Sequence, residues 1–113
     1  MQIIERKTQG DVHIWAIDGG IDRSTHDLFL AEMQKILAAG ATKVVLDFSR
    51  LTYINSLSLG TLVRVHGRFK KAGASLKFAN LHTAIGEILR MSRLNRVFDL
   101  YKSVEAAVEA FIP

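Results

Sequence analysis

The residues most able to do chemistry stand in the segment TYINSLSLGT, residues 52–61, where Asn55, Ser56 and Ser58 interrupt two apolar stretches. A serine hydroxyl in such a place can serve as a nucleophile, a phosphate acceptor or a helix cap. The nucleophile elbow of α/β-hydrolases needs G-x-S-x-G, because its strained turn admits no side chain two residues to either side of the serine. In SLSLG the first glycine is replaced by Ser56, and 113 residues are few for that fold. We therefore expect no catalytic serine, and a capped strand-to-helix turn is the simplest explanation of Asn55 and Ser56.

Metal and cofactor chemistry finds no support in the residue pattern. Cysteine is absent, which excludes disulfides, thiol nucleophiles and Cys-based metal sites. The four histidines lack the paired spacing of a zinc helix and are scattered at His13, His26, His66 and His82. His66 falls on a predicted apolar face and is interpreted as a hydrogen-bonded core histidine. The segment IDGGID, residues 17–22, matches neither a P-loop nor G-x-G-x-x-G, so it predicts a tight turn, and we expect no cofactor.

Length and composition predict one folded cytoplasmic domain over residues 1–113. The chain is 49% hydrophobic and 23% charged, and no apolar run is long enough to cross a membrane. Its first ten residues lack the basic and apolar regions of a signal peptide. A formal charge of +4 is weak support for nucleic-acid binding, because the basic residues are not interleaved with aromatics. We expect solvated basic faces at Arg64, Arg68, Lys70 and Lys71, and at Arg90, Arg93 and Arg96.

The first half of the chain predicts a hairpin, a helix and a central strand. QIIERKT and VHIWAI, residues 2–8 and 12–17, are β-branched and aromatic and flank a polar turn. An amphipathic helix is predicted over 27–39, capped by Ser24 or Thr25 and stopped by Gly40. The continuous apolar run KVVLDF, residues 43–48, is typical of a central strand.

The second half continues the alternation of helices and strands. A helix is predicted from about Leu57 to Gly73, with its apolar face at Leu59, Leu62, Val63, His66 and Phe69. A strand SLKFAN, residues 75–80, a helix over 83–92 and a closing strand or connection VFDLY, residues 97–101, follow. Ser103 is expected to cap a last helix. The pattern predicts an α/β sandwich with a mixed sheet of four to five strands and about four helices.

The motifs along these elements resemble the anti-sigma factor antagonists, stand-alone bacterial domains of the sulphate transporter and anti-sigma factor antagonist (STAS) class. GGID is similar to the family's G-x-[LI]-D after the second strand, and VVLDFSRLTYINS to its apolar strand, short connection and D-S turn. KKAGASLKFANL and ILRMSRLNRVFDLYKSVEAAV are similar to a later strand and to the closing segment. The resemblance covers nearly the whole chain and implies a single STAS domain.

The resemblance implies a non-catalytic binding module. Family members capture an anti-sigma factor that is also a serine kinase, and so release a sigma factor. The kinase phosphorylates a serine that aligns with Ser56, and a PP2C-type phosphatase reverses the reaction. Asp22 aligns with an aspartate at the kinase-facing end, close to this serine. The partner-binding residues implied are Asp22, Asn55, Ser56, Leu57 and Ser58, in a monomer or weak dimer.

The phosphorylation turn departs from the family pattern D-S-[ST]-G-L-G. Asn55 replaces the aspartate, Leu57 the small residue and Ser58 the first glycine, while the hydroxyl of Ser56 is kept. A phosphate on Ser56 at the start of a helix would add about −1.5 to −2 charges and be favoured by the helix dipole, so the fold is expected to persist. Replacing Ser56 by alanine is expected to cost about 1 kcal/mol through the lost cap.

Two other functions stay open at this level. The altered turn is also compatible with a regulatory or scaffold subunit that no kinase phosphorylates, such as one on an ATP-driven lipid transporter. A small hydrolase would pair Ser58 or Ser56 with His26 or His82, because the sequence does not place these histidines in space.

Overall fold

Six strands form one mixed sheet with helices on both sides in a computed structural model, which describes residues 1–6 and 8–112 and, at Thr83, the backbone only. The strands are β1 (Gln2–Glu5), β2 (His13–Gly20), β3 (Lys43–Asp47), β4 (Leu51–Tyr53), β5 (Ser75–Ala79) and β6 (Asp99–Tyr101). The helices are α1 (His26–Ala38), α2 (Ser56–Lys71), α3 (Thr83–Met91) and α4 (Val104–Glu109), with a 3-10 turn at Leu94–Arg96. The predicted α/β class and element order are confirmed. Lys7, expected in the first strand, lies outside the described residues.

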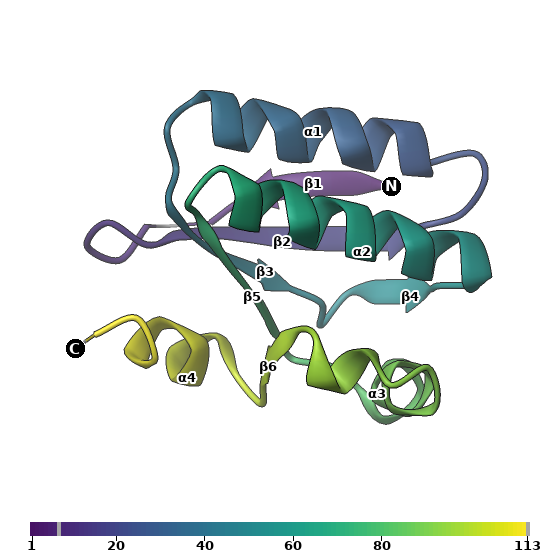
Figure 1. The fold of residues 1–113 in the computed structure, drawn as a ribbon. Coiled ribbons are helices and arrows are strands. Elements are labelled where there is room, and N and C mark those ends of the chain that lie inside the picture. The colour runs from purple at the N-terminus through teal and green to yellow at the C-terminus, as the bar shows by residue number, and fades with distance from the viewer. Residues whose placement is uncertain (7, 113) are drawn as a thin grey trace.

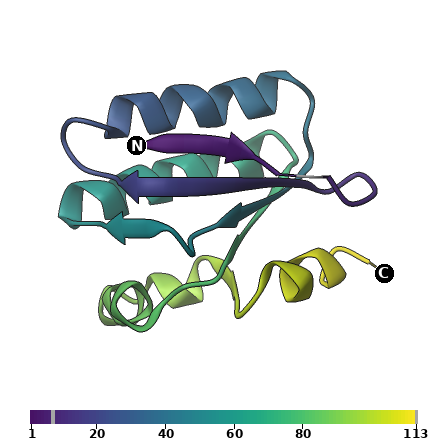
Figure 2. The same cartoon turned by 180° about the vertical axis from the view of Figure 1, so that it is seen from behind.

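The sheet order is β1-β2-β3-β5-β6, with β4 paired to β2. The hairpin of β1 and β2 is antiparallel, as predicted, and every other pair is parallel. Figure 1 shows α1 and α2 above the sheet and α3 and α4 below it, and Figure 2 shows the same layers from behind. Because parallel strands need crossovers, α1, α2 and α3 each return the chain to the same end of the sheet, whereas α4 follows the last strand.

The central strand β3 separates two groups of buried side chains. Val44 and Leu46 belong to the large core under α1 and α2, while Val45 belongs to the smaller core under α4. This division follows from the two-residue alternation of side chains along a strand. Phe48 and Phe78 extend the large core, with ring centroids 5.1 Å apart. A strand covered on both faces reads as a continuous apolar run, as KVVLDF does.

The sixth strand, β4, exceeds the four to five strands expected. Three residues are too few for a periodic pattern, so the sequence indicated only a connection there. In the structure β4 pairs with the end of β2 through a register shift at Gly19 and Gly20. A Cβ on Gly20 would lie 3.0 Å from the Cβ of Tyr53, so a side chain there would push the two strands apart. The glycine pair thus forms a close strand contact rather than the predicted tight turn.

Two helical details differ from expectation. On α2, Val63 is 43% exposed, and the buried residues are Ser58, Thr61, Leu62, Val65 and Phe69. His66 is only half-buried, and its ring packs on Phe98 with centroids 5.3 Å apart. It is therefore a boundary residue rather than a hydrogen-bonded core histidine. The predicted basic faces of α2 and of the segment around Arg93 are exposed. Among the described residues, no helix has the length and apolarity needed to span a bilayer.

Candidate functional site

The start of α2 is closed by a reciprocal pair of hydrogen bonds between Asn55 and Ser58. The Ser58 backbone N–H donates to Asn55 Oδ1 at 3.0 Å, and the Asn55 backbone N–H donates to Ser58 Oγ at 3.0 Å. This capping box satisfies two donors that the first turn of a helix would leave unpaired. Asn55 is the cap and Ser56 is the first helical residue. The expected loss of about 1 kcal/mol on truncating Ser56 is therefore wrong, because that side chain makes no cap bond.

Ser58 also ties α2 to the segment that follows β2. Its side chain is fully buried, and its hydroxyl donates to the carbonyl of Ile21. The Ile21 N–H donates to the Tyr53 carbonyl at 2.9 Å, so both backbone groups of Ile21 are held by the β4–α2 segment. The expectation that Ser58 touches a partner directly is corrected, because its side chain has no exposed surface. The same burial and the same bond to Ile21 argue against Ser58 as a nucleophile.

Ser56 is the accessible hydroxyl of this turn. It is exposed at the first position of α2, and its neighbours Tyr53 and Leu57 are 50% and 41% exposed. Backbone N–H groups in the first helical turn have no intrahelical acceptors, so a negative group on Ser56 would meet favourable dipoles. Two large exposed hydrophobic side chains beside an accessible hydroxyl are typical of a surface that contacts another protein.

Asp22 begins the loop that faces this turn. Its Oδ1 accepts hydrogen bonds from the Ser24 N–H at 2.8 Å, the Ser24 hydroxyl at 2.7 Å and the Thr25 N–H at 3.1 Å. The bonds from Ser24, and then those from Thr25, hold the pKa of the Asp22 carboxyl below its ordinary value because they favour the ionised form. Neither Ser24 nor Thr25 caps α1 with its side chain, which corrects that prediction: Thr25 Oγ1 donates instead to the Gly20 carbonyl at 2.7 Å.

Two surface hollows lie at this end of the molecule, where Figure 1 shows the end of β4, the start of α2 and the β2–α1 loop together. The Asp22 hollow is lined by Asp22, Arg23, Ser24, Tyr53 and Asn55. The Arg64 hollow is lined by His26, Ser56, Leu57, Gly60, Thr61 and Arg64. The structure thus gathers the predicted residues Asp22, Asn55, Ser56 and Leu57 at one surface and leaves Ser58 beneath it.

Sequence reasoning missed several members of these hollows. From the sequence, Tyr53 was placed in a connection and Arg64 among several solvated cations. The position of Arg64 could have been noticed in the sequence, because it lies about two helical turns after Ser56 on the same predicted helix. Tyr53 gave no comparable signal, since its exposure follows from the short strand β4.

The histidines do not complete a catalytic set. A nucleophile requires a base within hydrogen-bond reach that a third group orients. His82 Nε2 lies 3.0 Å from the Leu51 carbonyl and is engaged there. His26 lines the Arg64 hollow with Ser56, yet within residues 1–6 and 8–112 no hydrogen bond joins the two side chains. The Asp27 carboxylate lies 3.6 Å from His26 Nδ1, beyond hydrogen-bond range, and is 90% exposed. This geometry does not favour a hydrolase.

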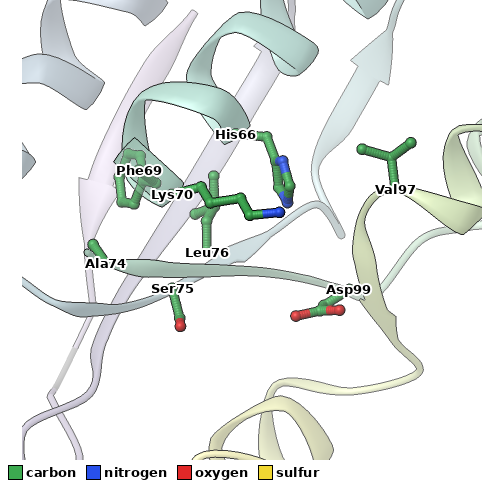
Figure 3. A pocket seen from close by; sticks show the side chains of 8 residues that line it. All are labelled: His66, Phe69, Lys70, Ala74, Ser75, Leu76, Val97 and Asp99. Atoms are coloured by element: carbon green, nitrogen blue, oxygen red, sulfur yellow. The ribbon is translucent and has the colours of Figure 1, made fainter. Parts of the chain in front are cut away.

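A separate cavity of about 280 Å³ lies near the other end of α2. It is lined by His66, Phe69, Lys70, Ala74, Ser75, Leu76, Val97 and Asp99, and none of these is a predicted site residue. Figure 3 shows the side chains of His66 and Lys70 converging from α2, with Asp99 across the β5 ribbon. Asp99 already pairs with Lys77 at 3.3 Å. We name this the His66 cavity. It contains charged side chains, but its hydrogen-bond donors and acceptors are not arranged around a common point.

Comparisons with known proteins identify the family of the chain. The STAS domain profile matches residues 4–107. BtrV of Bordetella bronchiseptica, assigned as an anti-sigma factor antagonist, is 28% identical over 98 residues, which cover 87% of this chain and 84% of BtrV.

Solved structures extend the similarity to three dimensions. A Thermotoga maritima protein assigned as an anti-sigma factor antagonist superposes with a TM-score of 0.86 at 22% identity, covering 96% of this chain and 92% of that one. The phosphorylated form of SpoIIAA, a Bacillus cell fate determinant, superposes with a TM-score of 0.70 at 14% identity, covering 96% of this chain and 98% of that one. At these identities the two structures establish the fold alone.

Proposed function

The chain belongs to the STAS domain family, and on that premise we propose that it is an anti-sigma factor antagonist switched by phosphorylation of Ser56. The observation that carries the proposal is the position of the Ser56 hydroxyl, which is exposed at the first residue of α2 and has no cap bond to lose. The name of the BtrV relative supports an anti-sigma factor as the partner. The partner surface comprises Asp22, Asn55, Ser56 and Leu57, with Tyr53 added.

The switch acts by changing the charge of a preformed surface. An anti-sigma factor with serine kinase activity would transfer the γ-phosphoryl group of ATP: the Ser56 Oγ–P bond forms, the bond from γ phosphorus to the bridging oxygen breaks, and the hydroxyl proton leaves. The product carries about −1.5 to −2 charges beside Tyr53 and Leu57. An apolar contact there would then have to desolvate a phosphate, which is costly. A PP2C-type phosphatase would restore the neutral hydroxyl.

Phosphorylation can be tested with the serine kinase anti-sigma factors of the source genome. Incubation with the cognate kinase and ATP should add one phosphate, located by mass spectrometry in peptides that contain Ser56. Ser56→Ala should abolish incorporation, whereas Ser92→Ala, an exposed serine at the end of α3, should leave it unchanged. Incorporation only at another residue, or none with any such kinase, would contradict the proposal.

Partner capture gives a second test. Wild type, Ser56→Ala and Ser56→Asp would be used as baits in native lysate, with the captured proteins identified by mass spectrometry. We expect the anti-sigma factor with wild type and Ser56→Ala, and its loss with Ser56→Asp. The protein should run as a monomer or weak dimer, and we place it in the cytoplasm with these partners.

A regulatory or scaffold subunit of an ATP-driven lipid transporter is the second candidate. The observation that favours it is Asn55, which stands where the family pattern carries an acidic residue next to the acceptor serine. Capture of a transporter ATPase equally by wild type and Ser56→Asp would support this alternative. Capture of an anti-sigma factor by wild type but not by Ser56→Asp would exclude the transporter alternative.

A further inference from the structure

The Arg64 hollow lies directly beside Ser56 on the exposed face of α2. It has a volume of about 230 Å³, and its lining combines a hydroxyl, a guanidinium and an imidazole from Ser56, Arg64 and His26. His26 contributes from the first turn of α1, so the hollow is walled by two helices. Once Ser56 carries the phosphate, the guanidinium and the protonated imidazole are the charged donors that a phosphate monoester prefers.

The spacing along α2 lets the Arg64 side chain reach toward Ser56. Eight residues separate the two positions, so their Cα atoms lie about 12 Å apart along the axis. Helical side chains lean toward the N-terminus, which directs the long Arg64 side chain toward Ser56. Gly60 stands halfway between them, and a Cβ built there meets no atom within 4 Å. The position midway between the hydroxyl and the guanidinium therefore carries no side chain and is not crowded by neighbouring atoms.

Arg64 and His26 differ in whether a carboxylate lies close to them. In the described part of the chain Arg64 has no carboxylate within 4.0 Å, whereas His26 faces Asp27 at 3.6 Å. The nearby carboxylates are Asp22 in the β2–α1 loop and Asp27 in the first turn of α1, and both would oppose an anion. Asn55, in place of an acidic residue, removes a third negative charge. An anion entering the hollow would meet one free cation first and a histidine second.

We propose that the Arg64 hollow holds the phosphoryl group of phospho-Ser56, with the Arg64 guanidinium as its main ligand and His26 as a second. The inference rests on the proposed function in that the phosphate is the one expected on Ser56. Two guanidinium N–H groups can pair with two phosphate oxygens. The modified side chain then lies along α2 instead of extending into solvent, so phosphorylation also covers Leu57 and the floor at Gly60. The switched state is an ordered surface that the protein makes with its own residues.

The test installs phosphoserine at position 56 during translation, so that no kinase is needed. Phosphorus-31 NMR then measures the second pKa of the phosphate during a pH titration. In the wild type this pKa should lie about 0.5 to 1 unit below that of a phosphorylated peptide covering residues 52–61, because solvent screens an exposed pair. Arg64→Gln should remove most of the shift and His26→Gln a smaller part.

Two further variants separate binding from general electrostatics. Arg68→Gln removes an exposed cation one turn further along, outside the hollow, and should leave the shift nearly intact. Gly60→Leu fills the path without changing any charge and should reduce the shift as Arg64→Gln does. An unchanged pKa in Arg64→Gln, or equal effects of the two arginine substitutions, would overturn the proposal. Circular dichroism checks that each variant is folded, and the kinase assay is independent, so either idea can fail alone.

Discussion

The two ends of α2 present charged and hydroxyl groups in opposite ways. At the N-terminal end, Asn55 and Ser58 exchange hydrogen bonds and Ser58 binds the Ile21 carbonyl, which leaves Ser56 exposed on a fixed frame. At the C-terminal end, His66 and Lys70 converge on a cavity whose single acid is already paired with Lys77. The second cavity is slightly larger than the Arg64 hollow, about 280 Å³ against about 230 Å³, yet among the described residues no hydrogen bond holds the His66 or Lys70 side chain.

Under the proposed function, this contrast makes support beneath a side chain a better guide to a site than the volume of a hollow. A group performs a defined task when its neighbours fix its position and leave its reactive atom free. Ser56 meets both conditions, and Lys70 meets only the second. Substitutions at the two ends should therefore differ in their effect on the free energy of unfolding.

The largest effect is expected from Ser58→Ala. The substitution leaves the buried Ile21 carbonyl and the Asn55 N–H without their partners, so we expect a loss of about 2 kcal/mol in the free energy of unfolding. Urea denaturation followed by circular dichroism measures it. Ser56→Ala is the matched control, a serine two residues earlier with an exposed side chain, and should change stability by less than about 0.5 kcal/mol. Equal losses in the two variants would show that Ser58 is not the structural serine.

The cap itself should have an intermediate effect. Asn55→Ala removes the acceptor for the Ser58 N–H and should cost about 1 kcal/mol. Asn55→Asp keeps an acceptor and adds a charge that the helix dipole favours, so its stability should match the wild type within about 0.5 kcal/mol. The same urea titrations compare the three proteins. A loss in Asn55→Asp as large as that in Asn55→Ala would contradict the capping role.

The Asp22 loop should contribute in acid. The bonds from Ser24 and Thr25 lower the folded-state pKa of Asp22 below the 3.8 of the unfolded chain. The ionised form therefore stabilises the protein above about pH 3.8, and this contribution is lost as pH falls through the folded pKa. Between about pH 5 and pH 2 the melting temperature of the wild type should fall more than that of Asp22→Asn. Parallel curves for the two proteins would mean that the ionised Asp22 carboxylate does not stabilise the folded protein.

The smallest effect is expected at the opposite end of the helix. Lys70→Gln removes an exposed charge from the His66 cavity and should alter the free energy of unfolding by less than about 0.5 kcal/mol. Thermal melting under the same buffer conditions checks this. A loss above about 1 kcal/mol in the free energy of unfolding would mean that neighbouring groups hold Lys70 in place, and the contrast between the two ends of α2 would fail.

Long periodic segments were predictable from the sequence, and short tertiary contacts were not. KVVLDF and the stripes of α1 and α3 carry enough apolar residues for their period to identify them. β4 has only three residues, and its pairing depends on the backbone contact between Gly20 and Tyr53, which no local pattern encodes. Val63 and Val65 are equivalent by composition, and only the packing against α1 decides which is buried.

The candidate site divides in the same way. Ser56 could be located because a hydroxyl at a strand-to-helix junction and a family motif coincide there. The function of Ser58 could not be predicted, because its partner Ile21 lies 37 positions away in sequence. The assignment of the cap to Asn55 rather than Ser56 required the helix boundary to within one residue, which sequence patterns do not provide.

The reciprocal bonds between Asn55 and Ser58 bear on how this turn evolved. These residues are two of the three departures from the motif of the family, and two reciprocal hydrogen bonds join them. With glycine at position 58, asparagine at 55 would have no hydroxyl to receive its N–H, and the Ile21 carbonyl would need another donor. Because Asn55→Asp keeps the acceptor for the Ser58 N–H, we expect that step toward the family motif to be nearly neutral. Ser58→Gly is the costly step whichever residue occupies position 55, because it removes the partner of both the Ile21 carbonyl and the residue-55 N–H.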